Sequence, residues 1–445
     1  MTGDNSIAIA LERRFSLSER GTSVRTEVAA GATTFLTMAY IVLVNPAILG
    51  QAGMPVAAVA AATCLAAAFA SIAMGLVANV PLALAPGMGL NAYFSFVVVQ
   101  GMGVPWPAAL ACVFLSGVAF LLLTLAGIRQ LIVAAIPPHL LAAVAGGIGL
   151  FIAFVGLRNA GIVVNSPATG VTLGNLRDPA PALAIFGLLL VAALSARRVR
   201  GAILIGIVVT AALGWAIGLG RMPTAPYSLA AIGETAFALD FGAVFSGRAG
   251  IGLLEVLFVF LFVDLFDNLG TLVAVTRASG LVDAEGRIPR LKRILMTDAV
   301  ATMAGALAGT STVTSYVESA AGVQAGGRTG LTAVVTGLLF LVTMLAAPYA
   351  ELVPTAATAP ALILVGALMM APLAAVAWDD AAVAIPAFLT LAMIPFTFSI
   401  ANGLAFGITA HAALTIATGK ARARDWLLFV LAGLFVLRFL FLAAG

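Results

Sequence analysis

The chain has 445 residues, of which 62% are hydrophobic and 9% are charged, and its formal net charge is +4. Soluble domains carry about 25% charged residues, so this composition excludes an ordinary soluble protein and indicates a membrane protein. The small positive charge does not suggest nucleic-acid binding. Cys64 and Cys112 fall inside apolar runs, and His139 and His411 lie far apart in the sequence, so we expect neither a disulfide nor a metal site. The first 25 residues are polar and lack the apolar core of a signal peptide.

Apolar runs long enough to cross a bilayer as helices recur along the whole chain. The candidate spans are 28–49, 56–80, 85–100, 106–126, 139–157, 182–196, 201–219, 251–275, 294–309, 314–325, 330–347, 357–377, 382–399 and 402–418. A further apolar run at 426–443 is compatible with a fifteenth span, with the true last span or with an interfacial helix. The pattern predicts an all-α polytopic membrane protein with about 14 transmembrane helices, since an outer-membrane barrel would show short alternating segments.

The distribution of Lys and Arg gives an orientation to these spans. With the N-terminus in the cytoplasm, 17 basic residues fall on the inner side, four fall on the outer side, and Arg438 is left over. Cytoplasmic loops of membrane proteins carry an excess of Lys and Arg. The sequence therefore predicts a cytoplasmic N-terminus.

The third and tenth candidate spans are short and interrupted. The third reads PLALAPGMGLNAYFSF (81–96), in which two prolines disrupt helical hydrogen bonding and two glycines permit close approach of a ligand. The tenth lies in TSTVTSYVESAAGVQAGGRTG (310–330), where small polar residues precede Glu318. The two are seven spans apart, so we expect two inverted seven-span repeats, with half-helices and short extended segments in spans 3 and 10. Paired interruptions of this kind point to the binding site of a transporter.

Several carboxylates fall inside apolar spans. Asp264 and Asp267 share one face of the eighth span, because they are three residues apart. Asp298 lies in the ninth span and Glu318 in the tenth. A charged side chain at the bilayer centre costs about 2.5–3.5 kcal/mol, which favours a role in binding or proton transfer. Structural roles stay open: Glu318 as a helix cap, the aspartates as hydrogen-bonding groups, and Asn91 as a tie between helices.

Five stretches resemble the AzgA-like hypoxanthine/adenine/guanine permeases, a branch of the nucleobase/ascorbate transporter superfamily. They read LERRFSLSERGTSVRTEVAAGATTFLTMAYIVLVNPAIL, ALAPGMGLNAYFSF, VDLFDNLGTLVAV, GTSTVTSYVESAAGVQAGGRTGLTAVVTGLLF and IPAFLTLAMIPFTFSIANGLAFG. The resemblance runs from about residue 11 to residue 410, nearly the whole chain.

The resemblance implies a core domain that moves against a gate domain in an elevator-like way, with the gate domains forming a homodimer. The expected division is a cytoplasmic N-terminal segment at 1–25, core domain at 26–127 (spans 1–4), gate domain at 128–245 (spans 5–7), core domain at 246–348 (spans 8–11), gate domain at 349–420 (spans 12–14) and a C-terminal apolar segment at 421–445.

The resemblance also implies site residues. Glu318 is expected to bind the base from span 10, and Asp267 from span 8, with Asp264 as the rival placement one turn earlier. The further expected substrate contacts are Asn91, Gly89, Phe94 and Val317. Proton coupling is expected at Asp267, Asp264 and Asp298. The sequence departs from the uracil and xanthine branches at Thr271, where some members carry histidine.

The implied function is proton symport of purine bases across the cytoplasmic (inner) membrane, with no metal and with the proton as the coupling ion in place of any cofactor. Three alternatives remain. An anion transporter of the sulfate-transporter type shares the inverted-repeat plan, although carboxylates at the site would repel anions. An intramembrane aspartyl protease needs two aspartates on facing helices, whereas Asp264 and Asp267 share one helix. A passive channel would transport without a proton gradient.

Overall fold

The computed structural model of the protein describes residues 3–127, 137–220, 222, 233–245, 256–264, 268, 271–272, 275–276, 288, 290–422 and 425–441. In this part of the chain, eight helices are long and apolar enough to cross a membrane, and three further apolar helices are shorter. The prediction of an all-α polytopic membrane protein is confirmed, while the count of 14 spans stays a prediction. Most of the run at 426–443 forms the helix α19, Trp426–Phe441, which contains one of the three shorter apolar helices.

The chain divides into two compact units, Met1–Thr124 with Asn175–Ala361, and Leu125–Gly174 with Leu362–Gly445. The predicted core segments 26–127 and 246–348 fall in the first unit, apart from residues 125–127. The segment 175–245, which we expected in the gate domain, belongs to the first unit as well. The division into core and gate domains therefore stays a prediction.

The first unit contains most of the described helices. Its elements are α1 (Gly3–Phe15), α2 (Val24–Met38), α3 (Ile41–Gly50), α4 (Val56–Val77), β1 (Leu84–Pro86), α5 (Met88–Ala92), the π-helix η1 (Tyr93–Gly101), α6 (Trp106–Leu125), α9 (Pro179–Ala196), α10 (Ala202–Ala216), α11 (Phe241–Phe245), α13 (Leu291–Ala308), β4 (Val313–Ser315), α14 (Ser319–Gln324), α15 (Gly330–Thr343) and the 3₁₀-helix η3 (Met344–Leu352). Residues 256–264 are helical too.

The interruptions predicted in spans 3 and 10 are present. Each span begins with a three-residue strand, β1 or β4, and continues into a short helix, α5 or α14. The two strands pair antiparallel, with Ala85 opposite Thr314. Two equivalent segments that run in opposite directions are what inverted repeats produce. Pairing also satisfies backbone groups that cannot be left without hydrogen bonds inside a membrane.

Side chains form hydrogen bonds with backbone groups of this segment that the strand pairing leaves free. The Ser71 hydroxyl, from α4, donates to the Leu84 carbonyl at 3.1 Å and accepts from the Leu84 N–H at 3.0 Å. The Ser319 hydroxyl accepts from the Ala83 N–H at 3.0 Å. The short strands are therefore bonded on both sides, which lets non-helical backbone lie inside the protein.

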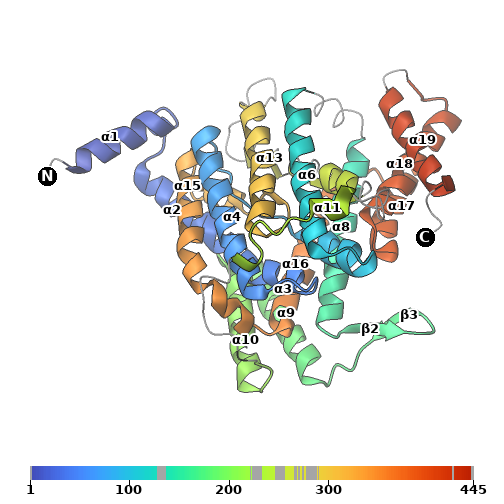
Figure 1. Cartoon of the computed structure of the whole chain (residues 1–445), viewed down its shortest axis with the longest axis horizontal. Coiled ribbons are helices and arrows are strands. Elements are labelled where there is room, and N and C mark those ends of the chain that lie inside the picture. Colours follow the sequence, from blue (N-terminus) through green and yellow to red (C-terminus); the bar gives the residue numbers. More distant parts are fainter. Residues whose placement is uncertain are drawn as a thin grey trace. The chain divides into compact units, whose positions relative to one another are not determined.

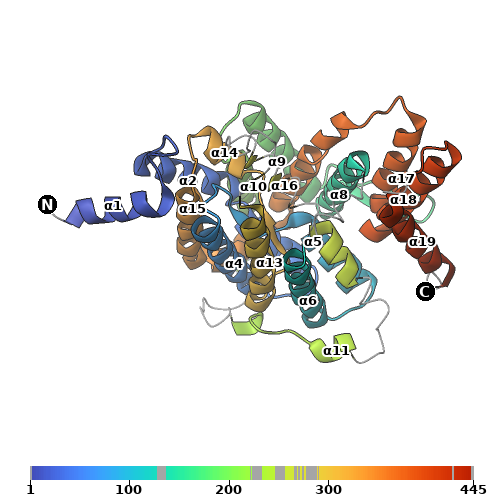
Figure 2. The ribbon, with the colours of Figure 1, turned by 90° about the horizontal axis from the view of Figure 1, so that it is seen from above.

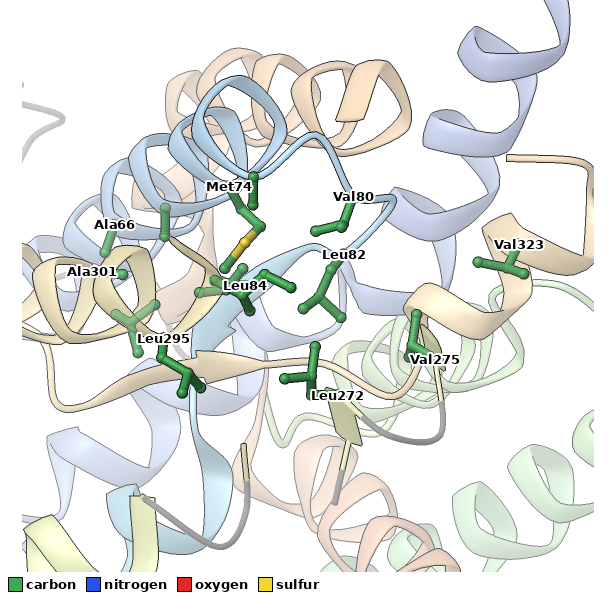
Figure 3. Packing of buried hydrophobic residues seen from close by; sticks show 14 residues of the cluster. Ala66, Met74, Val80, Leu82, Leu84, Leu272, Val275, Leu295, Ala301 and Val323 are labelled. Atoms are coloured by element: carbon green, nitrogen blue, oxygen red, sulfur yellow. The ribbon is translucent and has the colours of Figure 1, made fainter. Parts of the chain in front are cut away.

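A cluster of buried apolar side chains surrounds the strand pair. Figure 3 shows Met74 from α4, Leu84 from β1 and Leu295 from α13 gathered at this cluster, together with Leu272. Leu84 and Leu272 are fully buried. Tight packing of this kind fixes the position of the segment that carries the candidate site.

Helices α2, α4 and α15 lie side by side in both views of the ribbon (Figures 1 and 2). Glycines allow α4 and α15 to approach closely, since a Cβ added to Gly75 would lie 2.3 Å from the Gly330 carbonyl oxygen, and one added to Gly330 would lie 2.1 Å from the Gly75 carbonyl oxygen. Small residues at helix contacts are typical of membrane proteins, where close backbone approach supplies the packing energy.

The first span contains a break that the sequence analysis did not predict. Helix α2 ends at Met38 and α3 begins at Ile41, so Ala39 and Tyr40 form a turn inside the apolar run. Pro46 follows within α3, and its missing N–H leaves the Val42 carbonyl without the usual helical donor. The break places Tyr40 where it contacts the tenth span.

The described residues of the second unit form four longer helices, a hairpin and a short 3₁₀-helix. Its elements are α8 (Pro138–Asn159), β2 (Val163–Ser166), β3 (Gly170–Leu173), η4 (Ala371–Ala375), α17 (Ala381–Thr397), α18 (Ile400–Ala417) and α19, while α16 (Thr355–Leu368) begins in the first unit and ends in the second. Strands β2 and β3 form an antiparallel hairpin, with Asn165 opposite Val171. Helix α8 packs against α17, where Gly147 leaves room for the Ile394 side chain.

Candidate functional site

Glu318 lies where the tenth span turns from strand to helix. Strand β4 ends at Ser315, and Glu318 directly precedes α14. Although Glu318 occupies the N-cap position, its side chain makes no capping hydrogen bond to α14. Instead its Oε1 accepts a hydrogen bond of 2.7 Å from the hydroxyl of Tyr40. The carboxylate is thus held by the first span and is not used to cap its own helix.

The residues on either side of Glu318 have different environments. Tyr316 is buried, donates its hydroxyl to the Pro86 carbonyl and its N–H to the Ala83 carbonyl, and so fastens span 10 to span 3. Val317, an expected substrate contact, is 54% exposed. Glu318 itself is partly buried. The segment therefore presents one apolar and one charged side chain from a backbone that is firmly anchored.

Asn91, Gly89 and Phe94, all expected to contact substrate, are buried around the third span. The Asn91 amide donates to Asn45 Oδ1 at 2.5 Å, and Asn91 Oδ1 accepts from the Ser311 hydroxyl. The Phe94 ring packs on Phe260, with centroids 6.4 Å apart. Asn91 and Phe94 have no exposed surface, so their direct contact with a substrate stays a prediction.

Asn45 extends this buried network to two further elements. Its side-chain amide donates to Thr63 Oγ1 in α4 at 2.7 Å and to Thr310 Oγ1 at 2.9 Å. The side chain of Asn45 thereby joins spans 1, 2 and 10, and its Oδ1 accepts the hydrogen bond from Asn91 of span 3. Buried polar networks that are satisfied in this way give a membrane bundle a defined arrangement.

Of the three acids expected in spans 8 and 9, the structure describes Asp264 and Asp298. Asp264 is buried, and its Oδ2 lies 3.3 Å from the Thr302 hydroxyl, which donates to the Val313 carbonyl at 2.9 Å. Asp298 is fully buried within α13. Asp267 lies outside the described residues. The structure therefore does not test whether Asp267 or Asp264 is the main acid of span 8. The structure brings Asp264 beside β4 and leaves the proton-coupling assignments as predictions.

Asn268 connects the eighth span to β4. Its Oδ1 accepts from the Ser315 hydroxyl at 2.9 Å. Its Nδ2 has no hydrogen-bond partner among the described residues, and neither do the hydroxyls of Thr312 and Thr314, which are buried as well. Buried polar groups are normally paired, so hydrogen-bonding capacity remains around β4 for water or a ligand.

Sequence reasoning missed Tyr40, Asn45 and Asn268. The signal for the first two was present, since MAYIVLVNP (38–46) places a phenol, an amide and a proline inside an apolar run. An intramembrane polar residue is rarely without a partner. What the sequence lacked was the identity of that partner, because Tyr40 and Glu318 are 278 positions apart.

The sequence matches the permease family over residues 25–406. The chain belongs to this family. Adenine permease AdeP of Escherichia coli is 47% identical over 438 residues, covering 98% of this chain and 97% of that protein. Guanine/hypoxanthine permease PbuG of Bacillus subtilis is 46% identical over 441 residues, covering 96% and 99%. These relatives confirm the resemblance to the AzgA-like permeases and the prediction of a transporter in place of an enzyme.

The fold is shared with solved structures of low sequence identity. The transmembrane domain of the cyanobacterial bicarbonate transporter BicA superimposes with a TM-score of 0.61 at 16% identity, covering 88% of this chain and 96% of that one. At this identity the likeness shows the fold alone.

Proposed function

We propose that this permease is a proton-coupled symporter that imports purine nucleobases, namely adenine, guanine and/or hypoxanthine, across the cytoplasmic membrane. The observation that carries the proposal is the Glu318 carboxylate, which is held at the crossing of spans 3 and 10 by Tyr40 at 2.7 Å. A purine base is flat and uncharged, and its edge carries N–H donors. Hydrogen bonds from such donors to a carboxylate contribute about 1.5–3 kcal/mol each.

The relatives support the choice of purines over anions. Permeases named for adenine and for guanine and hypoxanthine align with nearly the whole chain, whereas the bicarbonate transporter shares the fold at 16% identity. A carboxylate at the site also disfavours an anionic substrate through charge repulsion. The anion transporter of the sulfate-transporter type remains the second candidate, because it uses the same fold.

For the coupling ion we propose a proton, loaded on Asp267, Asp264 or Asp298. Asp264 and Asp298 are both buried in the first unit. Protonation neutralises a carboxyl group and so lowers the cost of moving it through a low-dielectric region. We further propose an elevator-like movement of a core domain against a gate domain, a homodimer formed by the gate domains, and a cytoplasmic N-terminus in the inner membrane.

A competition experiment in whole cells tests the substrate class. Uptake of one radiolabelled purine is measured with excess adenine, guanine, hypoxanthine, xanthine, uracil, sulfate or bicarbonate. We expect purines to compete and the two anions to have no effect. Competition by sulfate or bicarbonate would favour the anion transporter. A protonophore should abolish accumulation, and uptake that persists unchanged in its presence would favour a passive channel.

A further inference from the structure

Tyr40 occupies an unusual place for a tyrosine in a membrane protein. It lies in the turn between α2 and α3, only 1% of its surface is exposed, and its hydroxyl donates to Glu318 Oε1 at 2.7 Å. Tyrosines of membrane proteins usually gather at the two interfaces, where the hydroxyl reaches water. A buried hydroxyl needs a partner, and here that partner is the carboxylate of the candidate site.

The backbone around Tyr40 fixes the direction of its side chain. The Ala39 N–H closes α2 on the Phe35 carbonyl at 2.7 Å, and the Tyr40 carbonyl accepts the N–H of Leu43 and of Val44, both at 3.0 Å, at the start of α3. Tyr40 thus begins a new helix while the preceding one ends. The backbone is therefore held on both sides, and the buried side chain is fixed by its hydrogen bond to Glu318. The phenol is in this position without a ligand.

The Glu318 side chain is restrained by Tyr40 and not by the helix that follows it. Its side chain makes no capping bond to α14, so α14 does not restrain it. A free glutamate side chain loses rotational entropy when a ligand fixes it. A partner that fixes it in advance removes this cost from binding. The Tyr40 hydroxyl does this through one oxygen, Oε1.

We propose that Tyr40 is a positioning residue of the substrate site, which holds Glu318 through Oε1 and turns Oε2 toward the N–H edge of the base. This inference rests on the proposed function and adds the first span to the binding machinery. Tyr40 acts through the carboxylate and not on the substrate. Its removal therefore weakens binding while the rate of the transport cycle at saturation changes little.

The test compares uptake kinetics of a labelled purine in Tyr40→Phe, Glu318→Gln, the double variant and wild type, each normalised to its amount in the membrane. Tyr40→Phe removes one hydrogen bond to a charged group, so we expect KM to rise about tenfold and Vmax to stay within about twofold. Tyr349→Phe serves as the matched control, because Tyr349 is 63% exposed in η3; it should behave as wild type.

The double variant separates positioning from a structural role. If Tyr40 acts through the carboxylate, adding Tyr40→Phe to Glu318→Gln changes KM by less than about twofold, since coupled residues are not additive. Multiplied effects in the double variant, or a wild-type KM in Tyr40→Phe beside an impaired Glu318→Gln, would overturn the proposal and leave the proposed function standing. Absence of purine uptake by the wild type would overturn both.

Discussion

The side-chain amide of Asn91 donates to Asn45 Oδ1 over 2.5 Å, so the interrupted third span is tied to the first span by two groups that have no exposed surface. Asn45 passes the connection on to Thr63 and Thr310. The Asn91 side chain therefore ties spans 1 and 3 together, which is the structural role that the sequence left open beside substrate binding. Its importance for transport would follow from holding the strand pair in place.

Asn45→Ala should destabilise the protein, because it leaves the Asn91 amide and the hydroxyls of Thr63 and Thr310 with one partner fewer. Each buried polar group left unpaired costs about 1–3 kcal/mol, so we expect a loss of at least about 2 kcal/mol and a lower melting temperature in detergent. Asn165→Ala, at an exposed position of β2, is the control. A melting temperature equal to that of the control would show that the network contributes no stability.

Glu27→Gln should weaken the junction of α2 with α15. Glu27 is fully buried, and its two oxygens accept from the N–H groups of Arg328, Thr329 and Thr332 and from the Thr332 hydroxyl. The carboxylate thus satisfies the free amides at the start of α15, where negative charge is also favoured.

A glutamine at position 27 offers one acceptor oxygen and turns an N–H₂ group toward those donors, so we expect a loss of about 2 kcal/mol in thermal unfolding. Glu19→Gln is the matched control, since Glu19 is exposed in the same N-terminal region and should change stability by less than about 0.5 kcal/mol. Equal melting temperatures for the two variants would contradict a capping role.

The sequence was sufficient for those features that depend on local pattern. Proline and glycine in 81–96, and the small polar run before Glu318, correctly predicted non-helical segments in spans 3 and 10. The break at Tyr40 was not predictable in the same way, because Ala39 and Tyr40 are compatible with a continuous helix. Both residues keep right-handed helical dihedral angles, and what marks the position in the structure is the long-range hydrogen bond from Tyr40 to Glu318.

The site was predictable to a similar extent. Glu318 stood out as a carboxylate in an apolar chain, and its polar surroundings identified the segment. Its partner Tyr40 could not be recognised from the sequence, because a tyrosine in an apolar span can equally well be a packing residue. The sequence singles out Asn91 as an amide in an apolar span, and its role as a substrate contact stays a prediction. The choice between binding a substrate and binding Asn45 depends on distances that spacing along one span does not contain.

Gly330→Ala should disrupt the contact between α4 and α15. A Cβ at this position would meet the Gly75 carbonyl oxygen at 2.1 Å, and a backbone atom has no rotamer by which to move away. The helices would have to separate along a closely packed interface, which typically costs about 1–3 kcal/mol or more. Gly433→Ala in α19, where nothing lies within 4 Å, should fold as wild type. A Gly330→Ala protein of unchanged thermal stability would show that the interface tolerates separation.

Glu318→Gln should weaken purine binding about ten- to hundredfold, because it converts charge-assisted hydrogen bonds into neutral ones at the crossing of spans 3 and 10. The substitution keeps the size of the side chain and leaves Oε1 able to accept from Tyr40, so the fold should persist. Glu351→Gln, in η3, makes the same chemical change away from the site and should leave affinity unchanged.

Binding of a labelled base to the purified protein measures affinity without the transport cycle. Wild-type affinity in Glu318→Gln would remove the carboxylate from recognition, and the hydrogen-bonding groups around β4, Asn268, Thr312 and Thr314, would then be the next candidates.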